Sequence, residues 1–207
     1  MQTLKLWAEE GLITLLYLDE SGCCPESPLS YGYGQIGQQK SIAQRTRKGR
    51  RVNIIGVWEE KTRLEYALKI GTNKTKSYLR FMNWQAERAM KRLFETGKPT
   101  VVIHDNASIH RSHLAKQQHQ IWLKQGLNVF FLPPYSPRHA KRGKRPFGAS
   151  GHSPCMNRIE EQWLHLKRQE LGGRVFEDEY DLAKAIIEGI GSRGQQGHYF
   201  VERLVFN

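Results

Sequence analysis

Two short apolar segments that lead into acidic side chains constrain this chain more than any other feature. Residues 101–103 are Val-Val-Ile and lead into Asp105, while residues 12–18 are mostly apolar and lead into Asp19. Short apolar runs that are rich in β-branched or aliphatic residues are typical of buried strands. We therefore expect two buried strands that each present a carboxylate where the strand ends.

The pattern along the rest of the chain predicts the order of the other elements. Apolar runs favour further strands, and apolar positions at helical spacing favour helices. Three strands precede two more that are reached through helices, which is the order of the ribonuclease H-like fold. We expect an α/β protein with a ribonuclease H-like mixed five-stranded sheet flanked by helices. The expected strands are 12–18, 52–58, 63–70, 101–103 and 127–132, and the expected helices are 75–94, 111–125, 157–171 and 178–190.

The length of 207 residues suits a single domain with its own core. We expect one domain over residues 1–207, with its core at about 11–172, a basic insertion at 138–154 and a C-terminal helix and tail at 173–207. Residues 189–194 match the pattern GxGxxG. Because they follow a helix rather than a strand, we interpret them as a flexible connector.

The chain is strongly basic, with a formal net charge of +12 and a pI of about 9.8. This charge favours a polyanion, and nucleic acid is a better candidate than a membrane surface. Without an apolar run of spanning length or a secretory signal, we expect a cytoplasmic, nucleoid-associated protein. Two basic clusters are expected to contact the DNA backbone. They are Arg45, Arg47, Lys48, Arg50 and Arg51, and Arg138, Lys141, Arg142, Lys144 and Arg145.

The three cysteines, Cys23, Cys24 and Cys155, are an odd number and form no paired metal-binding signature. Reduced thiols are the simplest interpretation. A zinc site that combines them with His152 is the alternative, because His152 and Cys155 lie close together in the sequence.

Several motifs, taken in order, resemble those of DDE transposases, and most closely the bacterial insertion-sequence branch of the mariner superfamily. The segments Tyr31–Gly34 and Arg50–Gly56 also fit the pattern of that family. Together the motifs cover most of residues 12–172, so the resemblance does not depend on any one of them. The motifs are Asp19-Glu20, Asp105-Asn106-Ala107 with His110, Leu132–Pro137 and Asn157–Trp163.

The resemblance implies that Asp19, Asp105 and Glu160 are the catalytic carboxylates and the metal ligands. Three converging carboxylates repel one another unless cations lie between them, and hard oxygen ligands suit Mg²⁺ or Mn²⁺. Two such ions would activate water or a 3′-hydroxyl and stabilise the leaving oxygen. The family reaction is cleavage at transposon ends followed by strand transfer into target DNA. Four neighbouring side chains are candidates to assist the carboxylates, namely Glu20, Asn106, His110 and Glu161.

Each carboxylate also has a purely structural alternative. Asp19 and Glu20 could be turn residues after a strand, and Asp105 could begin a helix. Asn157, followed three residues later by Glu160, resembles a capping box. We favour metal ligation because these alternatives do not explain the matching motifs around each residue.

The chain departs from the family pattern in two places. The basic, glycine-rich segment 138–154 separates the proline-rich motif from Asn157, and Arg158 stands where the family has a proline. We infer an insertion in a loop, which a fold tolerates well. The chain also begins too close to its first strand to hold the family's N-terminal helix-turn-helix domain, so we expect that domain to be absent.

The resemblance also implies partners. We expect DNA, a second copy of the chain in a homodimer or larger assembly, and a DNA-binding half encoded upstream. Two alternatives remain open for the function. One is a ribonuclease H-like or Holliday-junction nuclease that hydrolyses without strand transfer, and the other is an inactive DNA-binding remnant of a transposase.

Overall fold

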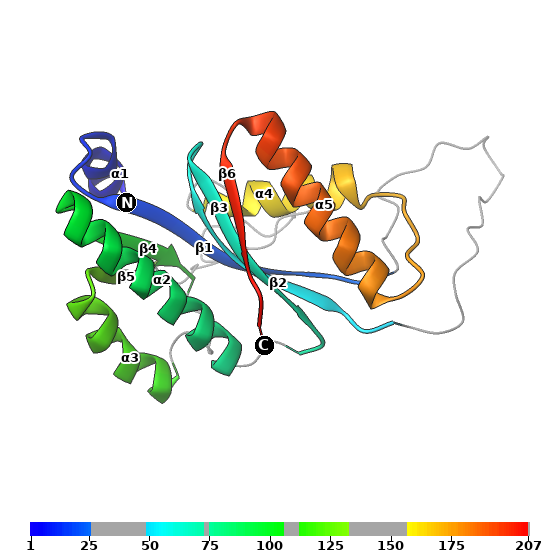
Figure 1. The fold of residues 1–207 in the computed structure, drawn as a ribbon, viewed down its shortest axis with the longest axis horizontal. Helices are drawn as coiled ribbons and strands as arrows, with labels where there is room; N and C mark the ends of the chain where they lie inside the picture. Colours follow the sequence, from blue (N-terminus) through cyan, green and yellow to red (C-terminus); the bar gives the residue numbers. More distant parts are fainter. Residues whose placement is uncertain (26–48, 73–74, 106–111, 133–156, 207) are drawn as a thin grey trace, which may run out of the picture. The chain divides into compact units, whose positions relative to one another are not determined.

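The computed structural model describes residues 1–25, 49–72, 75–105, 112–132 and 157–206 (Figure 1). By its internal contacts the chain divides into two compact units. The first consists of residues 1–19, 57–60 and 74–160, and the second of residues 20–56, 61–73 and 161–207.

A mixed sheet of six strands has the order β5-β4-β1-β2-β3-β6. β1 pairs in parallel with β4, β4 with β5, and β3 with β6. Only residues 60–62 join β2 to β3, which is too short for a parallel crossover, so these neighbours are antiparallel. The strands are β1 (Thr14–Cys23), β2 (Val52–Glu59), β3 (Arg63–Ile70), β4 (Thr100–His104), β5 (Leu127–Phe131) and β6 (Phe200–Leu204).

In the first unit, helices α2 (Thr75–Thr96) and α3 (His113–Lys124) pack on one another, and both contact β5 (Figure 1). A short helix, α1 (Gln2–Glu9), precedes β1. The ring of Tyr78 in α2 has its centroid 6.0 Å from that of His104 and 6.2 Å from that of Trp122. The indole N–H of Trp122 donates to the Asn83 side-chain oxygen at 2.7 Å. These rings form the core between the helices and the sheet, because all three are fully buried.

In the second unit, α5 (Glu179–Gly197) packs against β3 and β6 and against η3 (Leu166–Glu170), a π-helical turn that continues α4 (Ile159–His165). The side chain of Asp178 caps α5 by accepting from the backbone N–H groups of Tyr180 and Asp181, at 2.9 and 2.8 Å. Gly194 lies so close to β6 that a Cβ atom there would be 2.4 Å from Cγ2 of Val201.

The expected α/β class and mixed sheet are confirmed, but the sheet has six strands rather than five. β6 falls in the segment that we expected to be a tail. It was not predicted because apolar and polar residues alternate only weakly along its five positions. The connector expected at 189–194 is wrong, since these residues lie inside α5. Glycine is a poor helix former, but α5 needs Gly194 in order to approach β6.

The position of Asp19 differs from the expectation in one respect. β1 does not end at this residue but continues to Cys23, so neither Asp19 nor Glu20 is a turn residue. The insertion expected at 138–154 lies outside the described residues, and the single-domain organisation stays a prediction. Of the helices that the structure describes, none combines the length and the apolar character that a membrane crossing requires.

Replacing Gly194 by alanine is expected to destabilise the protein by about 1–3 kcal/mol, because the new methyl group overlaps Val201. Gly191→Ala is the matched control in the same helix, where an added Cβ meets no atom within 4 Å. That variant is expected to gain about 0.5–1 kcal/mol from helix propensity. Urea unfolding measures both free energies. Equal changes in the two variants would show that the contact with β6 does not constrain Gly194.

The stability of the first unit is expected to fall in acid through His119. The ring centroid of His119 lies 5.3 Å from that of Trp122 and 5.7 Å from that of Phe131, and burial lowers the pKa of His119. The unfolded chain therefore binds the proton more readily, so this contribution is present above the ordinary histidine pKa and is lost as the pH falls below it. His119→Phe should reduce the loss of unfolding free energy between pH 7.5 and 5.5. The exposed His113 of the same helix is the control, and His113→Phe should leave that loss unchanged.

Candidate active site

The register of β1 against β4 brings two predicted catalytic carboxylates level with each other. The paired residues run from Thr14 with Thr100 to Tyr17 with Ile103. Two residues beyond the last pair are Asp19, still within β1, and Asp105, the residue that directly follows the end of β4. Because the two strands run in parallel, this equal step of two brings both residues to the same level along the strands. Both residues are half-buried.

The start of α4 is tied to the same part of β1. Asn157 is 3% exposed, and its Nδ2 donates to the carbonyl oxygen of Leu18 at 2.9 Å. The backbone N–H of Glu160 donates in turn to the carbonyl oxygen of Asn157 at 3.2 Å. Leu18 directly precedes Asp19, the first predicted carboxylate. Asn157 is therefore anchored next to Asp19 in the chain of β1, and Glu160, the third predicted carboxylate, follows Asn157 by three residues in the first turn of α4.

The hydrogen bonds of Asn157 argue against the capping alternative. In a capping box the Asn157 side-chain oxygen would accept from the N–H of Glu160. That N–H donates to the backbone oxygen instead, and the buried Oδ1 of Asn157 has no hydrogen-bond partner among the described residues. The sequence analysis placed Asn157 in the motif Asn157–Trp163 and gave it a possible capping role, but it did not identify the anchor. The bond joins residues 139 positions apart, so no local pattern indicates it.

Charged and polar groups surround this part of β1. Arg158 forms an ion pair with Glu60, with 2.5 Å between Nε and Oε1. Burial, and then the carboxylate of Glu60, raise the pKa of Tyr17 to about 12, although Arg158 acts in the opposite direction. Tyr17 lies two residues before Asp19 in the strand and therefore on the same face. Its hydroxyl stays neutral at physiological pH, so it adds no charge to the site.

The four residues that were expected to assist the carboxylates do not all lie with them. Glu20 follows Asp19 in β1 and therefore points to the opposite face of the sheet. Glu161 is exposed in α4. Asn106 and His110 lie outside the described residues.

Only Arg50 and Arg51 of the expected DNA contacts lie in the described part of the chain. Nε of Arg50 is 2.7 Å from Oε1 of Glu179, and this hydrogen bond lowers the pKa of that carboxyl group. The side chain of Arg51 lies across Gly22, where a Cβ would be 1.8 Å from its Nε. The others fall outside the described residues: Arg45, Arg47, Lys48, Arg138, Lys141, Arg142, Lys144 and Arg145.

The residues at the candidate site suit a hard divalent cation by their chemistry. Carboxylate oxygens are the usual protein ligands of Mg²⁺ and Mn²⁺, and Asp19 and Asp105 lie level on neighbouring strands. Within the described ranges, however, no three His, Cys, Asp or Glu side chains are grouped closely enough to hold a metal ion. The proposed zinc alternative finds no support at Cys23, which is buried with its pKa raised by that burial. Cys155 and His152 lie outside the described residues.

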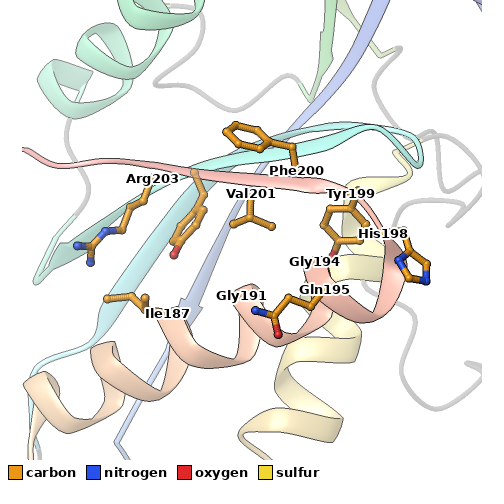
Figure 2. A pocket seen from close by; sticks show the side chains of 10 residues that line it. Ile187, Gly191, Gly194, Gln195, His198, Tyr199, Phe200, Val201 and Arg203 are labelled. Carbon is orange, nitrogen blue, oxygen red and sulfur yellow. The ribbon is translucent and has the colours of Figure 1, made fainter.

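A pocket of about 590 Å³ lies in the second unit, between α5 and β6 (Figure 2). Its lining combines apolar side chains such as Ile187 and Val201 with Gln195, His198 and Arg203. None of the three predicted catalytic carboxylates lines it. We therefore place the candidate site at the C-terminal end of the β1–β4 pair rather than in this pocket.

Comparison with solved structures shows where this fold occurs. The crystal structure of the Mos1 mariner paired end complex with Mn is 16% identical, with a TM-score of 0.55 over 95% of this chain and 57% of that chain. A pre-cleavage Mos1 transpososome is 15% identical, with a TM-score of 0.56 over 95% and 58% of the two chains. The chain thus spans a little over half the length of these proteins. At this identity the likeness establishes the fold.

Comparison at the level of sequence establishes the family. No curated protein sequence matches this chain. A family model described as DDE superfamily endonuclease matches residues 14–140, which is more than half of the chain and includes Asp19 and Asp105. The match stops within the segment 138–154, where we expect the insertion. With two carboxylates level on paired strands of a ribonuclease H-like sheet, the chain belongs to the DDE superfamily of endonucleases.

Proposed function

We propose that this chain is the catalytic domain of a metal-dependent DNA transposase, which cuts DNA at transposon ends and joins the ends to target DNA. The main support is the register of β1 against β4, which continues towards Asp19 and Asp105, together with the bond that anchors the start of the helix of Glu160 to β1. The similar solved structures are Mos1 complexes, one of them described as a strand transfer complex, with a TM-score of 0.54 and 16% identity.

In this proposal Asp19, Asp105 and Glu160 hold Mg²⁺ or Mn²⁺, with two ions as the expected number. When bound, such ions activate water or a 3′-hydroxyl and stabilise the leaving oxygen in an in-line displacement at phosphorus. The protein's own part is to hold three like charges in fixed places, which costs free energy that the cations offset. Similar structures include Mos1 complexes described as containing Mn or Mg.

DNA is the proposed partner, and the net charge of +12 supports it. The basic clusters around Arg51 and Arg145 contact the phosphate backbone, which contributes affinity without sequence specificity. A homodimer or larger assembly, and an upstream-encoded half that recognises the transposon ends, complete the proposal. The protein works in the cytoplasm, on the nucleoid.

A strand-transfer assay tests this function. The full chain is incubated with a pre-cut 3′-hydroxyl DNA end, a target plasmid and Mn²⁺. We expect joined products, and we expect Asp19→Asn, Asp105→Ala and Glu160→Gln each to reduce them by at least about 100-fold, because each removes a charged ligand oxygen. Glu161→Gln, which changes the exposed neighbour of Glu160, is the matched control and should retain activity.

The other outcomes distinguish the alternatives. Metal-dependent nicking without joining, lost in Asp105→Ala, would establish a nuclease that lacks strand transfer. DNA binding without nicking or joining would indicate an inactive remnant. Loss of activity in Glu161→Gln but not in Glu160→Gln would show that Glu161, and not Glu160, is the third catalytic carboxylate.

The salt dependence of DNA binding tests the backbone contacts. The logarithm of the DNA-binding constant falls linearly with the logarithm of the salt concentration. Removing a lysine or arginine that binds a phosphate should make this slope less steep by about 1. Arg51→Ala should show this change. Arg50→Ala should show less, because Arg50 must first give up its hydrogen bond with Glu179. Equal slopes in wild type and Arg51→Ala, measured by fluorescence anisotropy, would remove Arg51 from the DNA interface.

A further inference from the structure

A buried side chain, that of Asn157, joins the start of α4 to the strand that carries Asp19. The hydrogen bond from Nδ2 of Asn157 to the Leu18 carbonyl links residues 139 positions apart in the sequence. Both residues belong to the first unit, as do Asp19 and Glu160. Because the bond is buried, removing its donor would leave the Leu18 carbonyl without this hydrogen bond in a poorly solvated place.

This bond constrains the distance between two of the predicted ligands. Asp19 directly follows the accepting carbonyl, and Glu160 lies one helical turn after the donor. Few rotatable backbone bonds therefore separate either carboxylate from the anchor. A shift of α4 along β1 would break the bond, so its presence limits where the carboxylate of Glu160 can lie relative to that of Asp19.

A second contact of the same helical turn is weaker. The side chains of Arg158 and Glu60 are 39% and 42% exposed, and exposed ion pairs contribute only about 0–1 kcal/mol. The buried Asn157 bond therefore restrains the start of α4 more strongly than this ion pair does.

The bond to the Leu18 carbonyl requires a hydrogen-bond donor at the place of the Asn157 side-chain nitrogen. The amide nitrogen of Asn157 makes the anchor, whereas its buried Oδ1 has no hydrogen-bond partner in the described part of the chain. Aspartate has nearly the same shape but, when ionised, no donor. An ionised aspartate would therefore place an unpaired negative charge against the Leu18 carbonyl oxygen.

We propose that Asn157 is a positioning residue that fixes the start of α4, and with it Glu160, against the strand of Asp19, so that the two carboxylates can bind a divalent cation. This inference rests on the proposed function, which assigns both carboxylates to Mg²⁺ or Mn²⁺. Residues that orient metal ligands through hydrogen bonds typically change metal affinity by about 10–100-fold when they are replaced.

The test compares Mn²⁺ binding to the full chain, without DNA, in the wild type and in Asn157→Asp. Isothermal titration calorimetry should show an affinity at least about tenfold lower in the variant. The Mn²⁺ concentration for half-maximal DNA cleavage should rise by a similar factor, while the rate at saturating Mn²⁺ recovers. Arg158→Ala is the matched control at the neighbouring position, and its Mn²⁺ affinity should stay within about twofold of wild type because the ion pair with Glu60 that it loses is exposed.

A second variant covers the case in which Asn157→Asp does not fold. Asn157→Ser is uncharged, and its hydroxyl is too short to replace the bond to Leu18, so the same loss of Mn²⁺ affinity is expected. Urea unfolding identifies the folded variants. Folded variants that bind Mn²⁺ as tightly as wild type would overturn the inference and leave the proposed function intact. A wild-type chain that neither binds Mn²⁺ nor cleaves DNA would overturn the proposed function, and this inference with it.

Discussion

The parallel register between β1 and β4 is the constraint on which the candidate active site depends. A slip of one residue in a strand turns every side chain to the opposite face. Leu16, Leu18, Val102 and Ile103 are at most 1% exposed, so both faces of this strand pair are packed, and a slip would force every one of these side chains into a space shaped for another. The carboxylates of Asp19 and Asp105 are therefore aligned by apolar neighbours and not by any attraction to each other.

The third carboxylate depends on a different kind of interaction. α4 is reached only after a long stretch of chain, and a side-chain hydrogen bond from Asn157 ties its start to β1. Arg158, the next residue, adds an exposed ion pair with Glu60. Ile159, the first residue of α4, is fully buried, so apolar packing acts together with the buried amide.

Local sequence predicted those parts of the fold that local interactions govern. The apolar stripe of α2 and the existence of a helix that begins near Asp178 were evident, since helical spacing acts within a few residues. β6 was missed because its pairing with β3 depends on residues more than a hundred positions away. The helical state of residues 189–194 was missed because their three glycines lower helix propensity, while the contacts that favour glycine, such as that of Gly194 with Val201 in β6, are made with distant residues.

The sequence by itself determined the family motifs, the basic charge and the strands that carry Asp19 and Asp105, because each is written in short stretches of residue types. Only the tertiary structure decided that Asp19 lies within β1 rather than at its end, that the two aspartates are level, and that Asn157 anchors a helix rather than capping it. The physical reason is that strand register and long-range hydrogen bonds are settled by the simultaneous burial of distant segments, which no single segment specifies.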